Sequence, residues 1–283
     1  MPELPEVEVL VRHLAPLLEG RTVRHVLVRR ERVLRPTSRR ILVRTLTGAR
    51  FCGLTRRAKY LVFDLRRPNG VPVTLVGHLG MTGRMFLQPA AAPLPKHAAV
   101  VLDLGRFNFL FEDTRYFGRF TLDVSPLAGL GPEPLGKAFD PRTFHAALRR
   151  STQPIKVRLL DQSLVAGVGN IYASEALFVA GISPRKRANR LTAAESERLC
   201  RAVRAVLAEA VHFGSTVPLD FGGVGGRDRL FYYGRTEGTP DSFNERLRVY
   251  DRAGQPCARC GTAIRRIVQA ARSTFFCPRC QCV

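Results

Sequence analysis

Two cysteine pairs near the end of the chain, Cys257-Ala-Arg-Cys260 and Cys277-Pro-Arg-Cys280, decide how this segment folds. Paired cysteines at this spacing are typical of a zinc ribbon, in which a β-hairpin joins two knuckles. Four thiolates fill the tetrahedral shell of Zn²⁺ and leave no position for a reactive water, so we expect one structural zinc ion. A pair of disulfides is the alternative. It is disfavoured because we find no secretory signal, and cytosolic thiols stay reduced.

Three further cysteines lie outside this pattern. Cys282 could compete as a zinc ligand, although it follows Cys280 too closely to form a knuckle. Cys52 and Cys200 have apolar neighbours, and we predict that both are buried thiols.

The first part of the chain predicts one helix followed by many strands. An apolar stripe that includes Val7, Leu10 and Leu14 predicts a helix over residues 3–19, which Gly20 ends. Short β-branched and aromatic runs follow, broken by glycine and proline, at residues 22–28, 60–65, 73–77, 98–104 and 107–111. This spacing of short strands predicts a β-sandwich or barrel.

Helical signals dominate after the linker-like segment 129–136. Asp140 is a predicted N-cap before Pro141. Helical runs over 154–162 and 171–180 flank a Gly-Val-Gly-Asn turn that ends at Asn170. Thr192-x-x-Glu195 is a capping box, and it opens a helix that ends near Gly214. We therefore predict an α+β protein. Its parts are an N-terminal helix and antiparallel β-sandwich (1–128), a linker (129–140), a helical domain with a glycine-rich loop region (141–245) and a zinc-binding β-hairpin (246–283).

The chain is strongly basic. Its 283 residues include 45 Lys+Arg against 23 Asp+Glu, which gives a formal charge of +22. Because nearly all the cations are arginine, whose forked guanidinium suits phosphate, a polyanion is the expected partner. A GC-rich genome would explain arginine over lysine but not the excess of cations over carboxylates. No apolar run approaches the ~18 residues of a membrane helix, and we expect a cytoplasmic protein that associates with the nucleoid.

The N-terminus carries the most reactive chemistry in the sequence. Removal of Met1 would expose a secondary amine on Pro2, which is far less protonated at neutral pH than a lysine. Its attack on an aldehyde carbon gives an iminium ion, which acts as an electron sink for elimination at the neighbouring carbon. Glu3 and Glu6 could transfer protons there. Alternatively, Pro-Glu-x-Pro-Glu only caps a helix.

Pro2-Glu-Leu-Pro-Glu-Val-Glu8 resembles the amino-terminal signature of the formamidopyrimidine-DNA glycosylases, bacterial base-excision repair enzymes. The resemblance continues along nearly the whole chain in the segments 57–60, His78-Leu-Gly-Met-Thr-Gly83, Asp113-Thr-Arg-Tyr-Phe-Gly118, 161–175 and 272–281. The fourth segment is similar to the family's helix–two-turn–helix, and the fifth is similar to the second half of its zinc finger. The resemblance implies a monomeric DNA glycosylase and AP lyase acting on oxidised purines in duplex DNA.

The resemblance also implies a role for each matching residue. Pro2 would be the nucleophile, Glu3 the general acid, Lys59 the proton donor in β-elimination, and Arg272 a participant in δ-elimination. Residues that would contact DNA, including the phosphates flanking the lesion, are Glu6, His78, His97, Lys156, Asn170, Arg272 and Tyr250. Met81, Arg115 and Phe117 would fill the gap left by the extruded nucleotide. Taken alone, Lys59 is more typical of a solvated strand residue, and Met81 and Phe117 of core residues.

The chain departs from the family pattern in two places. Thr114 and Tyr116 replace a proline and a basic residue of the third signature. The glycine-rich stretch 217–246 is longer than the corresponding family loop, which covers the everted base, so it is either a remodelled lid or a solvated insertion.

Two other functions remain open at this point. One is the endonuclease VIII branch, which acts on oxidised pyrimidines; Leu4, where that branch has glycine, argues against it. The other is a non-catalytic, zinc-dependent protein that binds damaged DNA, which the intact Pro2, Glu3 and Lys59 disfavour.

Overall fold

The computed structural model describes residues 2–213 and 247–282, which form two compact units. The boundary between the units in the sequence lies between Ala128 and Gly129. The predicted glycine-rich stretch, residues 217–246, lies entirely outside the described residues. Within the described ranges, no helix combines the length and the apolar character needed to cross a membrane.

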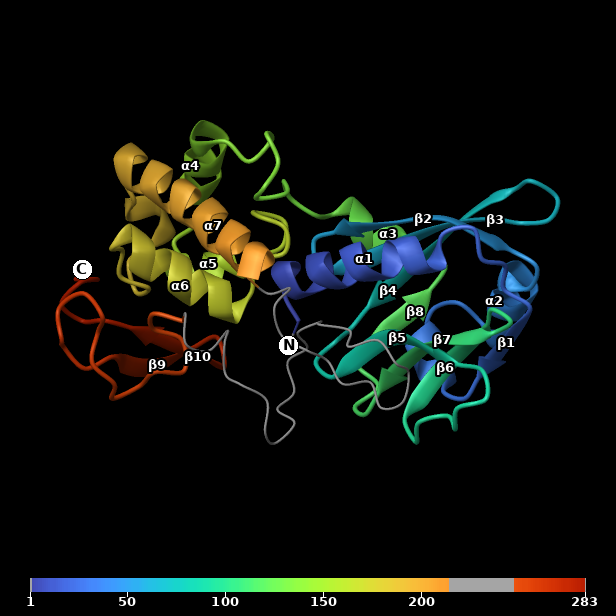
Figure 1. Cartoon of the computed structure of the whole chain (residues 1–283). Coiled ribbons are helices and arrows are strands. Elements are labelled where there is room, and N and C mark those ends of the chain that lie inside the picture. Colours follow the sequence, from blue (N-terminus) through green and yellow to red (C-terminus); the bar gives the residue numbers. More distant parts are fainter. Residues whose placement is uncertain (1, 214–246, 283) are drawn as a thin grey trace. The chain divides into compact units, whose positions relative to one another are not determined.

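The first unit is the predicted helix and β-sandwich (Figure 1). One sheet has the strand order β1–β6–β7–β5 and the other the order β2–β3–β4–β8, with antiparallel neighbours throughout. The strands are β1 (His25–Val28), β2 (Arg50–Arg57), β3 (Tyr60–Arg66), β4 (Pro72–His78), β5 (Gly83–Pro89), β6 (Ala98–Asp103), β7 (Phe107–Asp113) and β8 (Arg119–Thr121). The helical segments are α1 (Leu4–Leu18), η1 (Glu31–Leu34), α2 (Arg39–Leu46) and α3 (Ser125–Ala128).

Aromatic side chains from both sheets meet in one core. Phe63 on β3 lies with its ring centroid 5.7 Å from that of Phe109 on β7, in an edge-to-face arrangement. The apolar stripe of α1, including Leu10 and Leu14, joins the same core. This burial fixes the start of α1 against the sandwich, because every ~25 Å² of apolar surface removed from water contributes roughly 0.6 kcal/mol.

The second unit contains the predicted helices and the zinc hairpin. Its elements are α4 (Pro141–Arg149), α5 (Ile155–Leu159), α6 (Asn170–Ala180), η2 (Ala188–Arg190), α7 (Ala193–Phe213), β9 (Arg265–Gln269) and β10 (Arg272–Phe276). The Thr192–Glu195 capping box is confirmed, because Glu195 N donates to Thr192 Oγ1 and Thr192 N donates to Glu195 Oε2. The helix expected over 154–162 is shorter than predicted and ends at Leu159, where a turn begins.

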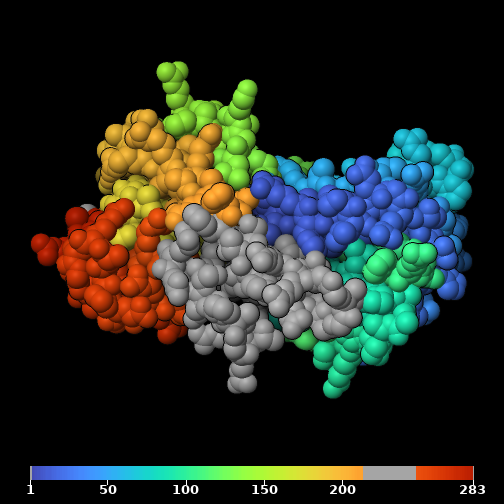
Figure 2. All heavy atoms as spheres, viewed as in Figure 1, coloured from blue at the N-terminus to red at the C-terminus, as the bar shows by residue number. Residues whose placement is uncertain are grey.

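The hairpin of β9 and β10 packs on α6 through a small apolar cluster that includes Phe178, Ile264 and Phe275. Figure 2 shows the C-terminal segment, in red, against the yellow surface of the helices of the same unit. Arg259 strengthens this contact, because its guanidinium lies 4.4 Å from the ring centroid of Phe178 and donates to the carbonyls of Phe178 and Val179. A cation is favourable there, since these carbonyls end α6.

One cysteine prediction is wrong. Cys200 is buried as expected, but Cys52 is exposed. Cys52 lies at a β-bulge, where Phe51 pairs with Leu65 and Gly53 pairs with Asp64, so Cys52 is the extra residue. The bulge leaves Phe51 in the core and turns Cys52 to solvent.

Candidate DNA-repair site

The N-terminal segment is held in place at the start of α1. Pro2 is buried, and Glu3, the N-cap of the helix, is 1% exposed. The backbone N–H of Glu3 donates a 2.8 Å hydrogen bond to Oε2 of Glu6 in the first turn. Both acidic side chains lie at the positive end of the helix dipole. The capping role expected from the sequence is therefore present, and Glu3, the residue that follows Pro2 in the chain, has a buried side chain.

Lys59 lies in the turn between β2 and β3, not on a strand, and it is 8% exposed. Its neighbour Ala58 is buried with a left-handed φ of 53°, a conformation that non-glycine residues adopt at some cost in free energy. Arg56 steadies the turn by donating to the carbonyl of Ala58 at 3.0 Å. The expectation of a solvated strand residue is wrong for Lys59, because this turn folds back into the protein.

The same Arg56 ties the turn to α1 through Glu8. Arg56 Nε lies 2.7 Å from Oε2 of Glu8, and Arg12 contacts the other carboxylate oxygen at 2.8 Å. Burial alone would raise the pKa of Glu8, but hydrogen bonds and charge from the two arginines outweigh burial and lower the pKa. The helix that follows Pro2 and the turn that carries Lys59 are thus fixed to each other within the first unit.

His78 lies next to this turn, because it pairs with Tyr60 in the sheet and its ring centroid is 4.8 Å from the tyrosine ring. Its Nδ1 accepts a 3.1 Å hydrogen bond from the backbone N–H of Gly80. Burial, with the charges of Lys59 and Arg119, lowers the pKa of His78 to about 4. The imidazole is therefore neutral at pH 7, with its hydrogen on Nε2, which can donate to an anion.

Two loops with exposed apolar tips meet beside His78. A Cβ on Gly80 would lie 2.6 Å from the backbone nitrogen of Gly118, and a Cβ on Gly118 would lie 2.6 Å from the carbonyl oxygen of His78. Only glycine allows this backbone approach. It brings together the loops that carry Met81 and Phe117, which are 42% and 45% exposed. Both side chains were expected in the core on spacing alone, and the structure places both at the surface.

Asp113 holds the loop that carries Phe117 in place. Sequence reasoning did not single out this residue. It is fully buried, and its carboxylate accepts hydrogen bonds from Thr82 Oγ1 at 2.6 Å and from the N–H groups of Arg115 and Gly118. The guanidinium of Arg115 lies 4.8 Å from the ring centroid of Phe117. The apolar ring of Phe117 and the hydrogen-bonding guanidinium of Arg115 therefore lie together on one ordered loop.

In the second unit, a buried lysine connects α5, α6 and the hairpin. Lys156 has no exposed surface, and its ammonium donates to Oδ1 of Asn170 and, at 3.0 Å, to Oγ1 of Thr274. The amide of Asn170 in turn donates to the carbonyl of Ser273 at 2.9 Å. Arg272 is exposed at the first position of β10. These bonds place the cationic start of β10 beside the N-terminus of α6.

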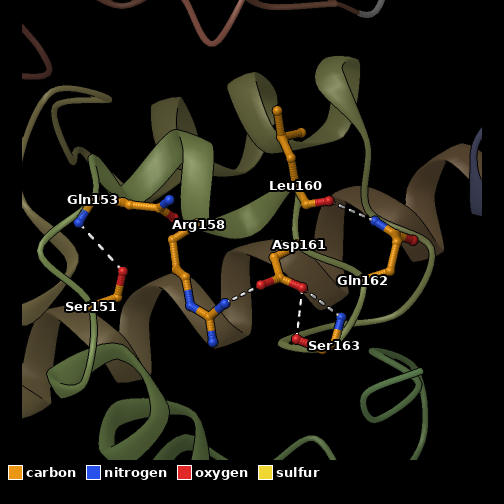
Figure 3. Close-up of polar contacts among 7 residues, drawn as sticks. All are labelled: Ser151, Gln153, Arg158, Leu160, Asp161, Gln162 and Ser163. Atoms are coloured by element: carbon orange, nitrogen blue, oxygen red, sulfur yellow. Dashed lines mark hydrogen bonds and ion pairs between the residues drawn. The ribbon is translucent and has the colours of Figure 1, made fainter. Parts of the chain in front are cut away.

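The turn before α6 is held by side-chain amides and carboxylates. Gln162 Nε2 donates to the carbonyl of Val168 at 2.8 Å, and its Oε1 accepts from the N–H of Gly167 at 2.9 Å. Figure 3 shows Asp161 accepting from both the N–H and the hydroxyl of Ser163. The helix N-terminus at residue 170 therefore follows a fixed turn, an arrangement that suits anion binding.

Glu175 organises the segment that carries Tyr250. This carboxylate is 1% exposed on α6 and accepts hydrogen bonds from the N–H groups of Arg248, Val249 and Tyr250 at 2.8–2.9 Å. Burial raises its pKa, although the three N–H donors oppose that effect. The signal for Glu175 in the sequence was a lone carboxylate in an apolar helix, and sequence reasoning missed it.

The four predicted zinc ligands converge. The Sγ atoms of Cys257, Cys260, Cys277 and Cys280 all lie within 4.8 Å of one another. Three of the Sγ–Sγ distances are 3.4 Å (Cys260–Cys280), 3.5 Å (Cys260–Cys277) and 3.9 Å (Cys257–Cys280). They are close to the ~3.8 Å edge of a sulfur tetrahedron with zinc–sulfur bonds of about 2.3 Å. These separations exclude disulfides, and the donor set fits one zinc ion. Cys282 is exposed and outside the cluster.

The ligands are supported by their surroundings. The N–H of Arg259 donates to Sγ of Cys257, and the N–H of Cys280 donates to Sγ of Cys277, each at 3.4 Å. Gln281 accepts from the N–H of Cys277 and donates to the carbonyl of Ile182, so it anchors the second knuckle to the helical part of the unit. Such outer contacts orient the thiolates of a metal site.

Comparison with known proteins gives matches along the whole chain. Residues 1–120 match the family model of the formamidopyrimidine-DNA glycosylase N-terminal domain, residues 130–219 its H2TH domain, and residues 254–282 a zinc finger found in FPG and IleRS. The chain is 43% identical over 288 residues to the formamidopyrimidine-DNA glycosylase of Thermus thermophilus, covering 99% of this chain and 98% of the relative. It is 38% identical over 281 residues to that of Carboxydothermus hydrogenoformans, covering 99% and 100%.

Solved structures agree with this result. The Lactococcus lactis enzyme in complex with DNA containing Fapy-dG is similar with a TM-score of 0.85 and 33% identity, covering 99% of this chain and 100% of that one. The same enzyme bound non-covalently to DNA containing an AP site is similar with a TM-score of 0.84. With family matches in both units and full-length relatives at about 40% identity, the chain belongs to the formamidopyrimidine-DNA glycosylase family of zinc-finger DNA-repair enzymes.

Proposed function

We propose that this glycosylase excises oxidised purines, namely 8-oxoguanine and formamidopyrimidines, from duplex DNA and then cuts the strand by β,δ-elimination. The observation that carries the proposal is the burial of Pro2 and of Glu3, its neighbour in the chain, at the start of α1. An amine with an adjacent proton donor matches covalent catalysis through a Schiff base. The Lactococcus relatives, crystallised with DNA containing Fapy-dG or an abasic site, support the substrate class.

The proposed reaction begins with attack of the Pro2 nitrogen on C1′ of the damaged nucleotide. The bond from C1′ to the base breaks and its electron pair leaves with the base, which takes up the proton that the Pro2 nitrogen releases. Glu3 then protonates the ring oxygen as its bond to C1′ breaks, and the nitrogen lone pair forms the iminium. Loss of a proton from C2′ then expels the 3′ phosphate, and a second elimination expels the 5′ phosphate. Lys59, whose charge acts on the nearby His78, is the proposed proton donor in the first elimination, and Arg272 is proposed to act in the second.

The remaining residues are proposed to hold the DNA. His78, His97, Asn170, Arg272 and Tyr250 contact its backbone, and Met81, Arg115 and Phe117 fill the space of the flipped nucleotide. Lys156 has no exposed surface, so we assign its contribution to the placement of Asn170. Glu6 is proposed to act indirectly, because its carboxylate accepts a hydrogen bond from the backbone N–H of Glu3 and so fixes the start of α1. The enzyme is proposed to bind DNA as a monomer.

Borohydride trapping tests the proposal. Incubation with an 8-oxoguanine duplex and borohydride should give one covalent adduct, mapped by mass spectrometry to Pro2 of protein that has lost Met1. Pro2→Leu, which keeps Met1 and so removes the secondary amine, should give none, whereas the control Pro5→Ala should behave like the wild type. Absence of an adduct from folded wild-type protein lacking Met1 would reject the lyase mechanism. Stronger cleavage of a thymine-glycol duplex than of 8-oxoguanine would reject the purine preference.

A further inference from the structure

Tyr116 has an unusual backbone conformation on the loop that carries Arg115 and Phe117. Its φ of 53° is left-handed, which costs a non-glycine residue roughly 1 kcal/mol. While its two neighbours are exposed, the ring of Tyr116 packs against the apolar core of the first unit. The left-handed turn thus directs this one side chain inward from an exposed loop.

The inward direction brings the Tyr116 hydroxyl between two other side chains. Arg30 Nε lies 3.1 Å from the hydroxyl oxygen, and the Arg30 guanidinium lies 5.5 Å from the ring centroid. On the other side, Nδ1 of His97 lies 3.4 Å from the same oxygen. His97 also accepts a 3.2 Å backbone hydrogen bond from the N–H of Asp113, so its position is fixed relative to the loop.

The donors and acceptors in this chain of contacts can be assigned. Arginine only donates, so the tyrosine oxygen accepts from Arg30. A phenol oxygen that already accepts one hydrogen bond is best satisfied by donating its own hydrogen, so we assign the hydroxyl hydrogen to the contact with Nδ1 of His97, which accepts it. In a neutral imidazole that accepts at Nδ1, the hydrogen is on Nε2.

We infer that Tyr116, supported by Arg30, is a positioning residue that holds His97 in the tautomer with its hydrogen on Nε2, the form that donates to a DNA phosphate. The opposite tautomer would present a lone pair at Nε2 and repel a phosphate oxygen. His78 is held in the same tautomer by a different group, the N–H of Gly80. This role rests on the proposed contact of His97 with DNA, but the tautomer itself is a property of the free protein.

The tautomer is measurable without DNA. Long-range ¹H–¹⁵N correlation spectra of imidazole-labelled protein at pH 8 should show His97 with a protonated Nε2 and an unprotonated Nδ1. In Tyr116→Phe, which keeps the ring and removes the hydroxyl, the His97 nitrogen shifts should move toward a mixture of tautomers, while the His78 shifts stay unchanged. Wild-type His97 with its hydrogen on Nδ1, or identical His97 shifts in the variant, would overturn the inference.

Binding measurements separate this role from the repair reaction. Tyr116→Phe should weaken binding to an abasic-site-analogue duplex about fivefold, the magnitude expected for one hydrogen bond. The effect should disappear in the His97→Ala background. Arg30→Gln should shift the His97 nitrogen resonances, because it removes the donor to the Tyr116 hydroxyl. Arg29→Gln is the control, because it removes one positive charge from the neighbouring residue. It should leave these resonances unchanged, since Arg29 donates to the carbonyl of Pro95 and not to Tyr116. Equal losses from Tyr116→Phe with and without His97 would overturn the role in DNA binding, whatever the outcome of borohydride trapping.

Discussion

The ammonium group of Lys156 donates a 3.0 Å hydrogen bond to Oγ1 of Thr274, joining the short helix α5 to strand β10 across 118 positions of sequence. Since Lys156 also bonds to Asn170, one buried cation connects the first residue of α6 with the zinc hairpin.

Lys156→Met keeps the length of the side chain and removes this charge. We expect it to lower the free energy of unfolding by about 1–3 kcal/mol, because buried acceptors lose their donor. DNA affinity should fall about tenfold as Asn170 loses its support. Urea unfolding and fluorescence anisotropy measure the two effects. Lys186→Met is the matched control, since its ion pair with Glu195 is partly exposed and should contribute less than about 1 kcal/mol. Equal effects from the two variants would contradict this account.

His78 should make the stability of the fold depend on pH in a defined window. Its pKa is lowered from 6.5 to about 4, so the unfolded chain binds a proton at this residue before the folded protein does. Protons therefore favour unfolding, and stability contributed by neutral His78 is lost as the pH falls from about 6.5 to 4.

Urea unfolding of wild type and His78→Gln at pH 7.5 and 4.5 tests this sign. The wild type should lose up to ~3 kcal/mol more than the variant between the two pH values. His25→Gln, at an exposed position on β1, should follow the wild type. If His78→Gln loses as much stability as the wild type, the assignment is wrong.

Asp113→Asn should disorder the loop that presents Arg115 and Phe117. The amide replaces one acceptor oxygen with a donor that faces the N–H groups of residues 115 and 118. We expect the free energy of unfolding to fall by about 1–3 kcal/mol and lesion binding to weaken more than binding to undamaged duplex. Asp123→Asn is the control, because its carboxylate serves Ser125 in an exposed turn. Unchanged discrimination between damaged and undamaged DNA would refute the role of Asp113.

The zinc ligands can be separated from the neighbouring cysteine. Cys280→Ser should lose the metal, since it removes one of four converging thiolates, whereas Cys282→Ser should retain one zinc ion per chain. Metal content after dialysis and DNA affinity measure this difference. The metal-free variant should bind DNA at least tenfold more weakly, because a metal-held hairpin has little core of its own. Zinc loss from Cys282→Ser would show that the fourth ligand is misassigned.

Features specified by nearby residues were predictable from sequence. The cysteine spacing, the stripe of α1 and the capping box of α7 are local patterns, and each is confirmed. Motifs shared with a known family also pointed to Pro2 and Glu3, and the catalytic roles of both residues stay predictions. The α+β architecture followed from the order of these patterns.

Features that depend on distant partners were not predictable. The burial of Lys59 depends on a turn that folds inward, and the exposure of Cys52 depends on a bulge that no local propensity shows. The side chain of Tyr116 meets Arg30, which is 86 positions away. In each case the deciding contact is set by tertiary packing, which overrides the local pattern.

Glu175 has a consequence for how the second unit can be dissected. Its carboxylate is satisfied by three consecutive backbone N–H groups that lie just before the zinc hairpin. A truncated chain ending before residue 247 would leave that carboxylate in an apolar helix without these donors. The metal hairpin is therefore not a detachable appendage, and helices and hairpin should unfold in a single cooperative transition. Grafting experiments that exchange zinc fingers between relatives need to carry segment 248–250 along with its glutamate.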